Sequence, residues 1–326
     1  MSEHEDAQQL STEWSRSMGL RLPVVNAPMG GVAGGRLAAA VTAAGGLGMI
    51  GMGSAGSAPA LETQLPYLDG VDGPFGIGVV DWVVRERPEL LEMAIAARPR
   101  LLSVSFGTDT AWVARVREAG IVTATQVYDA EDARRAQDAG IEVLVARGEE
   151  GGGHGAAGMN MLPLLDAVLK VAEVPVLAAG GLAEPADLEL VLAAGASGAW
   201  LGTRLAACTE SLLSDAGRAA LVAAHGTDTV VTEVFDVGLE LPWPAKFPAR
   251  VLRNEFTGRW VGHEAELAAD ASAHAALSAA AAADDLRVAP VDAGLGVGAV
   301  TAVRPVGEVL RELCAGALHL RNEGHH

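Results

Sequence analysis

The chain has 326 residues with 41 acidic and 23 basic side chains, so its formal net charge is −18. Such a charge opposes binding to phosphate backbones and to anionic lipid, which argues against nucleic acid and membrane surfaces as partners. The two cysteines, Cys208 and Cys314, are too few and too far apart for a disulfide framework or a cysteine metal site.

The N-terminal segment, residues 1–20, is polar and acidic. It lacks the basic start and the apolar stretch of a signal peptide, and no run in the chain approaches the ~20 apolar residues of a membrane span. We therefore expect a cytoplasmic protein. The last four residues, 323–326, resemble the start of an expression tag.

Residues 21–224 alternate short β-branched runs with Ala-rich amphipathic stretches, which is typical of parallel strands covered by helices. Eight strands are predicted, at Val24–Asn26, Leu47–Ile50, Phe75–Val79, Leu101–Ser105, Val122–Gln126, Val143–Ala146, Val176–Ala179 and Ala199–Leu201. Helices are predicted between them, at Leu37–Ala44, Pro88–Ala97, Thr110–Ala119, Ala130–Ala139, Leu162–Val171 and Pro185–Ala194. Several of these stretches end in Ala-Gly, where glycine permits the left-handed turn that ends a helix.

Eight strand-helix units favour an α/β fold of the (β/α)8 TIM barrel type. The alternative is a doubly wound sheet, which requires a Gly-rich fingerprint after its first strand. Gly30, Gly31, Gly34 and Gly35 match that fingerprint only loosely. The barrel is therefore the preferred prediction for residues 21–224.

The alternation stops after residue 224. Residues 235–260 are rich in Pro, Trp and Arg, and residues 264–285 predict one almost uninterrupted Ala-rich helix. We expect residues 225–300 to form a smaller, partly helical domain that contributes to the substrate site or closes over it. Residues 301–326 then supply a last helix, around Val306–Ala317, that returns to the barrel.

The first motif that could bind a ligand is Asn26-Ala27-Pro28-Met29-Gly30-Gly31, at the end of the first predicted strand. Active sites of such barrels lie at the C-terminal ends of the strands. The segment is either a tight turn or a wall of backbone groups and a Met side chain against a flat cofactor.

His154 lies in a second motif, Gly148-Glu149-Glu150-Gly151-Gly152-Gly153-His154-Gly155, after the sixth predicted strand. Glycines on both sides let a ligand approach the backbone and leave the imidazole free to project over the site. Such a histidine can exchange protons with a carbon acid or bind an anion. A purely structural histidine is the alternative, and the glycine setting favours the functional role.

Two further glycine motifs follow the last two predicted strands: Gly180-Gly181, and Gly202-Thr203. Backbone N–H groups of these neighbouring loops can converge on an anion, and this is where barrels commonly bind phosphate. Ordinary turns are the alternative, but the pairing of the two loops predicts a phosphorylated cofactor.

No metal site is predicted, because the adjacent Glu149 and Glu150 are more typical of a solvated loop. P-loop, HExxH and GxSxG motifs are absent from the sequence, which argues against kinase and hydrolase functions.

Four segments together, NAPMGG, GEEGGGHG, LAAGGLA and LGTRLAACTES, resemble the nitronate monooxygenase family, formerly called 2-nitropropane dioxygenases. The resemblance spans Leu22 to Ser211 in order and spacing, and continues more weakly through Lys246–Asn254 and Gly294–Gly298. It implies an FMN-dependent TIM barrel in which His154 matches the active-site histidine, acting as base toward neutral nitroalkanes or as partner of the nitronate anion. The cofactor-binding residues that it implies are Asn26, Ala27, Pro28 and Met29 beside the flavin ring, Gly180, Gly181, Gly202 and Thr203 at the phosphate, and Gly152. Gln126 and Arg147 are further cofactor-binding candidates.

This chain departs from the family pattern at four positions: Arg147 and Trp200, where Gln is frequent, Gly151, where the family run has Ala, and Gly78, where Asn is frequent. Arg147 could pair with the electron-rich edge of the flavin or with an anionic substrate. Alternatively, Arg147 could form a salt bridge with Glu149 or Glu150, and the sequence does not favour either role. These departures concern the substrate more than the fold.

The resemblance predicts FMN-dependent oxidation of alkyl nitronates, such as propionate 3-nitronate, or of nitroalkanes by O2 without nicotinamide. The same barrel and Gly-Gly-His loop occur in flavin-dependent enoyl-acyl-carrier-protein reductases and NAD(P)H:quinone reductases, so an NAD(P)H-dependent reductase is the main alternative. A non-catalytic accessory flavoprotein is a further alternative, motivated by the departures at Arg147 and Trp200. The expected partners are a small-molecule substrate and O2, and a homodimer is one option for the assembly.

Overall fold

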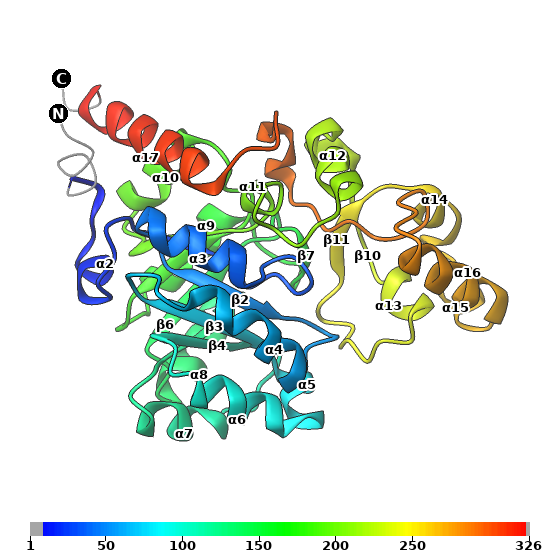
Figure 1. Ribbon diagram of the computed structural model, residues 1–326, viewed down its shortest axis with the longest axis horizontal. Helices are drawn as coiled ribbons and strands as arrows, with labels where there is room; N and C mark the ends of the chain where they lie inside the picture. Colours follow the sequence, from blue (N-terminus) through cyan, green and yellow to red (C-terminus); the bar gives the residue numbers. More distant parts are fainter. Residues whose placement is uncertain (1–8, 324–326) are drawn as a thin grey trace.

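The computed structural model describes residues 9–323 and contains a nearly closed barrel of eight parallel strands (Figure 1). The strands follow the order β1-β9-β8-β6-β5-β4-β3-β2, and a bridge between Val25 and Leu47 joins the two ends of that order. All eight predicted strands and the TIM barrel are confirmed. Their bounds are β1 Val24–Asn26, β2 Gly48–Met52, β3 Phe75–Val80, β4 Leu101–Ser105, β5 Val122–Val127, β6 Val143–Arg147, β8 Val176–Ala179 and β9 Gly198–Leu201.

Helices cover the outside of the barrel, as the apolar strands require. The predicted Ala-Gly helix ends are confirmed, because Gly45, Gly120, Gly140 and Gly195 all adopt positive φ. The helices of this part are α3 Gly35–Ala44, α4 Ala58–Gln64, α5 Asp81–Glu86, α6 Pro88–Ala96, α7 Trp112–Glu118, α8 Ala130–Asp138, α9 Met161–Leu169, α10 Pro185–Ala193, α11 Thr203–Ala206 and α12 Asp215–Ala223, with the 3-10 turn η1 at Leu65–Leu68.

The N-terminal end of the barrel is covered by α2 (Glu13–Ser17). Trp14 is buried in one apolar cluster with Met49, Leu101 and Leu177 of the barrel strands. The hydroxyl of Thr12, which caps α2, donates to the carbonyl of Ser197 just before β9. Residues 9–20 of the predicted polar segment therefore pack against the barrel, and the opposite end remains for ligands.

A second, three-stranded sheet has the order β10-β11-β7 and contains β10 (Thr229–Thr232), β11 (Ala249–Leu252) and β7 (Gly153–His154). The strand β7 belongs to the glycine loop after β6, and its membership of this sheet was not predicted. Four helices pack beside the sheet around an apolar cluster that includes Phe235, Phe256 and Leu277. They are α13 Val234–Gly238, α14 Glu255–Trp260, α15 Glu264–Ala268 and α16 Ala271–Ala282.

The single Ala-rich helix predicted over residues 264–285 is wrong, because the structure divides it into α15 and α16. The cause is Asp270, whose side chain accepts hydrogen bonds from the backbone N–H groups of Ser272 and Ala273. A carboxylate in this position caps the start of a new helix instead of continuing the old one.

The last helix, α17 (Val306–Glu323), extends further than the predicted Val306–Ala317 and lies against α10 and α3 (Figure 1). The 3-10 turns η2 (Gly226–Asp228) and η3 (Leu295–Ala299) connect the second sheet to the barrel end. Of the predicted tag remnant at residues 323–326, Glu323 ends α17, and residues 324–326, like the first eight residues, lie outside the described part of the chain. Within residues 9–323, no helix combines the length and apolar character that a membrane crossing requires.

We predict that Gly48→Ala destabilises the barrel, because a Cβ at Gly48 would lie 1.8 Å from the carbonyl oxygen of Ala38 in α3. The overpacking should lower the free energy of unfolding by at least roughly 1–3 kcal/mol. The matched control is Gly258→Ala in α14, where a Cβ meets nothing within 4 Å and is expected to stabilise the helix by about 0.5–1 kcal/mol. Urea unfolding of both variants tests this, and equal stability of the two would contradict the close strand-helix contact.

Candidate active site

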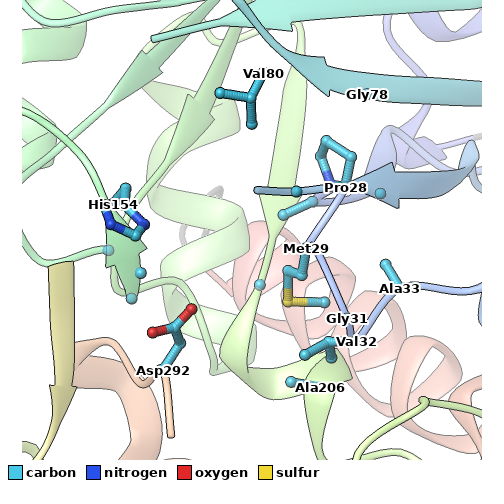
Figure 2. A pocket seen from close by; sticks show the side chains of 18 of the residues that line it. Pro28, Met29, Gly31, Val32, Ala33, Gly78, Val80, His154, Ala206 and Asp292 are labelled. Atoms are coloured by element: carbon cyan, nitrogen blue, oxygen red, sulfur yellow. The ribbon is translucent and has the colours of Figure 1, made fainter. Parts of the chain in front are cut away.

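A cavity of about 600 Å³ opens at the C-terminal ends of the barrel strands (Figure 2). Its walls come from the loops after β1, β2, β6, β8 and β9 together with residues 290–292 and 296. The predicted site residues that line it are Ala27, Pro28, Met29, Gln126, Arg147, Gly152, His154, Gly180, Gly181, Gly202 and Thr203. The structure therefore brings eleven of the twelve together, while their roles toward a ligand stay a prediction.

Asn26 is the predicted residue that does not line the cavity. Its side chain is fully buried, donates from Nδ2 to the carbonyl of Met49 at 2.8 Å, and accepts at Oδ1 from the Met49 N–H at 2.6 Å. The amide thus joins β1 to β2, where the barrel closes through a single bridge. This structural role occupies the polar atoms that the predicted cofactor contact would need.

Pro28 and Met29 form one wall of the cavity, and Figure 2 shows both facing it. Gly78 of β3 lies behind the Pro28 ring, and a Cβ at this glycine would approach Pro28 Cγ to 2.2 Å. The departure from Asn at position 78 therefore makes room for the proline.

The glycine loops after β8 and β9 present free backbone donors. Within residues 9–323, the N–H groups of Gly180, Gly181, Gly202 and Thr203 take part in no protein hydrogen bond. Gly180 and Gly181 adopt φ of +113° and +73°, which L side chains rarely tolerate. The hydroxyl of Thr203 accepts from the N–H of Gly294 at 2.9 Å and retains its own proton for donation. Four unpaired donors in one cavity match the chemistry of a phosphate group.

Arg147 organises the loop that carries His154. Its buried guanidinium donates from Nη2 to the carbonyls of Gly151, Gly152 and Gly153 at 3.0, 3.0 and 3.1 Å. A Cβ at Gly155 would lie 1.8 Å from Nη1, so this loop closes around the cation only because it is made of glycine. Burial lowers the pKa of Arg147 from its ordinary value, although a guanidinium remains charged.

The alternative prediction of a salt bridge from Arg147 to Glu149 or Glu150 is wrong for the described residues. The Glu150 carboxylate instead accepts from the N–H of Met161 at 2.9 and 3.0 Å, and that of Glu149 faces the N–H of Gly158. Backbone carbonyls therefore accept the hydrogen bonds of the Arg147 guanidinium. Glu149 and Glu150 instead accept hydrogen bonds from backbone N–H groups of the segment that follows the loop. Gly152 lies against Ala293 and Gly294, whose backbone atoms a Cβ would approach to 2.6 Å.

His154 is held on two sides by residues that the sequence analysis missed. Its Nε2 lies 3.0 Å from both carboxylate oxygens of Asp236, a nearly buried residue of α13. The indole of Trp243 stacks on the imidazole at 3.6 Å between ring centroids with an interplanar angle of 7°. Because Nε2–H donates to the carboxylate, Nδ1 is the ring nitrogen left for a ligand.

A third missed residue, Asp292, lines the cavity on the side of His154 (Figure 2). The signal available for it was its place two residues before the Gly294–Gly298 turn, where the family resemblance continues. Asp236 and Trp243 had no comparable signal, because they follow no barrel strand and lie in a stretch without a repeated pattern.

Comparison with known proteins agrees with this architecture. The model of the family described as nitronate monooxygenase matches residues 12–81 and 86–316 of the chain. The chain belongs to the nitronate monooxygenase family. One relative, the nitronate monooxygenase of Neurospora crassa, is 30% identical over 89% of this chain and 87% of its own length.

Another relative is the (3aS,4S,5R,7aS)-5-hydroxy-7a-methyl-1-oxo-octahydro-1H-indene-4-carboxyl-CoA dehydrogenase of Rhodococcus jostii, which is 31% identical over 70% of this chain. The match spans 64% of that protein, less than two thirds of its length.

Two solved structures resemble the whole fold. FabK from Thermotoga maritima has a TM-score of 0.85 at 26% identity, covering 96% of this chain and 98% of its own. The nitroalkane oxidase from Streptomyces ansochromogenes has a TM-score of 0.81 at 28% identity, covering 95% and 99%. Membership of the nitronate monooxygenase family and this second neighbour support a flavin-dependent oxidoreductase.

We predict that Asp236→Ala slows reduction of the bound flavin by substrate on the order of 10- to 100-fold, because the imidazole loses the group that orients it. Asp236→Asn, which retains an acceptor oxygen at the same place, should recover part of the rate. Anaerobic stopped-flow absorbance measures the rate, and flavin content and melting temperature serve as controls. Equal loss in both variants, or loss only in proportion to flavin content, would contradict an orienting role.

Proposed function

We propose that this member of the nitronate monooxygenase family is an FMN-dependent enzyme that oxidises nitroalkanes or their nitronates with O2 and without nicotinamide. The observation that carries the proposal is the placement of an oriented imidazole and of four unpaired backbone donors in the walls of one cavity. Family membership and the nitroalkane oxidase neighbour support the same activity.

FMN fits the residues of the cavity. The N–H groups of Gly180, Gly181, Gly202 and Thr203 would hold its phosphate, and Pro28 with Met29 would form a wall along its ring. The bound flavin supplies the electron acceptor, which the side chains of the cavity do not offer. Phosphate binding here depends on backbone dipoles, because none of the four residues is basic.

The chain itself contributes proton transfer and orientation. Nδ1 of His154 would accept the proton from the carbon next to a nitro group, while the carboxylate of Asp236 stabilises the imidazolium that results. The Trp243 indole on the face of the ring limits its rotation. Arg147 keeps the glycine loop, and therefore the imidazole, in position.

An NAD(P)H-dependent reductase is the second candidate, and the similarity to FabK over nearly the full length of both chains is the observation that favours it. A non-catalytic accessory flavoprotein is less favoured. Arg147, one of the two departures that suggested it, braces the histidine loop, and Trp200 packs in the barrel interior.

Rapid mixing of the purified protein distinguishes these functions. We expect a yellow protein whose flavin is bleached anaerobically by a nitroalkane or nitronate and not by NAD(P)H within the turnover time. In His154→Asn, bleaching by the neutral nitroalkane should slow by ~10²-fold or more, because the base is removed. Bleaching by NAD(P)H without bleaching by nitronate would instead establish the reductase, and a protein that cannot take up FMN would support the accessory role.

The phosphate position has its own test in Gly202→Ala. A Cβ at Gly202 meets no protein atom closer than 3.8 Å, so the substitution is tolerated by the protein but occupies space at the predicted phosphate. We expect the affinity for FMN to fall about tenfold or more. Flavin fluorescence titration measures it, with the melting temperature of the flavin-free protein and the Gly258→Ala variant as controls. An unchanged affinity for FMN would show that its phosphate does not bind beside Gly202.

A further inference from the structure

Asp292 is fixed in place by the strand that also holds His154. Its backbone forms a bridge with Val251 of β11, and the adjacent Ala293 N–H donates to the carbonyl of Arg250 at 3.3 Å. The neighbouring residues of β11, Ala249 and Arg250, pair with His154 and Gly153. Because β10 occupies the other edge of β11, His154, Gly153 and Asp292 lie in that order along the same edge.

The carboxyl group of Asp292 faces the cavity and has no protein partner. Its side chain is exposed to the cavity, and within residues 9–323 it takes part in no hydrogen bond or ion pair. Figure 2 shows the carboxylate on the side of the cavity that carries His154, across from Met29. A Cβ at Gly153 would lie 3.1 Å from Oδ2, which places this oxygen beside the histidine strand.

Other charges near the ligand position offset this carboxylate only in part, through Arg147 and His154. Among the described residues that line the cavity, the ionisable side chains are Arg147, His154 and Asp292. Arg147 directs its Nη2 donors to three loop carbonyls, and His154 already faces a second carboxylate, that of Asp236. An anion that approached Nδ1 would therefore meet negative charge from Asp292 without a cation dedicated to it.

We propose that the site beside His154 takes its substrate as an uncharged molecule, a nitroalkane or another neutral carbon acid, because the carboxylate of Asp292 faces the ligand there. This inference rests on the proposed function and chooses between its two substrate forms. A neutral substrate needs a base, and Nδ1 of His154 supplies one. A preformed nitronate needs a positive pocket, which these residues do not form.

The preference depends on pH through Asp292 itself. The groups that influence it are His154 on β7, Arg147 on β6 and Asp236 on α13. Desolvation by the surrounding protein is the largest effect and raises the pKa of Asp292 above its ordinary value, opposed by His154 and Arg147. The carboxyl is therefore ionised, and excludes anions, only above this raised pKa, and the discrimination is lost as the pH falls through it.

The test compares propionate with propionamide, two ligands of similar size that differ in charge, on the FMN-loaded protein. Binding is followed by the change in flavin absorption for the wild type, Asp292→Asn and the control Asp284→Asn. Asp284 is an exposed residue outside the cavity lining, and its φ of +54° suits asparagine. The control removes the same formal charge from the protein surface.

We expect Asp292→Asn to bind propionate about tenfold more tightly than the wild type at pH 8, with propionamide affinity changed less than about twofold. The difference should shrink as the pH is lowered, and Asp284→Asn should match the wild type. In turnover, the KM for a nitronate should fall in Asp292→Asn while that for the parent nitroalkane stays nearly constant.

Several outcomes would overturn the inference: equal effects on both probes, equal effects of both variants, or weaker binding of propionate in Asp292→Asn. Loss of flavin with unchanged propionate affinity would show that Asp292 contacts the cofactor instead. A protein whose flavin does not respond to nitro compounds fails the proposed function, yet the probe titrations still decide the charge preference. If no flavin binds, the same titrations followed by tryptophan fluorescence decide it, because Trp243 stacks on His154.

Discussion

The pairing of Gly153 and His154 with Ala249 and Arg250 is the contact on which the site depends. A loop between a barrel strand and its helix is ordinarily free to vary. Here two of its residues form the edge strand of a second sheet. The position of the imidazole is therefore fixed by both the barrel and the second sheet. The same β11 strand forms a bridge with Asp292, and helix α13 carries Asp236, which lies at hydrogen-bond distance from the imidazole. The barrel thus supplies the cavity, and the second sheet supplies the residues that surround its histidine.

The cavity separates two kinds of electrostatics. In the loops after β8 and β9, unpaired backbone N–H groups of four residues provide positive dipoles without a basic side chain. Near the histidine, the guanidinium of Arg147 donates to carbonyls of the glycine loop, and Asp236 and Asp292 lie close to the imidazole. Under the proposed function, fixed dipoles would hold a group that is always anionic, whereas the titratable groups would act where a proton moves. This division suits a cofactor that stays bound and a substrate that changes charge during the reaction.

Much of the fold could be predicted because its signals are local. Apolar runs with glycine turns identify buried parallel strands, and Ala-Gly pairs locate the helix ends, as the positive φ values at Gly45 and Gly195 confirm. The prediction of one long Ala-rich helix was wrong for an equally local reason. The Asp270 side chain accepts hydrogen bonds from the N–H groups that begin α16, and so starts a new helix there. Asn26 was predicted in a segment that does line the cavity. Its amide, however, hydrogen-bonds the backbone of strand β2 where the barrel closes, and this contact could not be inferred from the segment itself.

The sequence by itself determined the barrel, the strand ends at which the ligand cavity opens, and the glycine loops with His154. These follow from short-range periodicity and from backbone conformations that only glycine adopts readily. Tertiary structure alone decided what surrounds the imidazole: Asp236 is 82 residues away along the chain, and Trp243 and Asp292 are more distant still. No local pattern marks Asp236 or Trp243, and the place of Asp292 beside the histidine strand follows from the pairing of β7 with β11, a long-range contact.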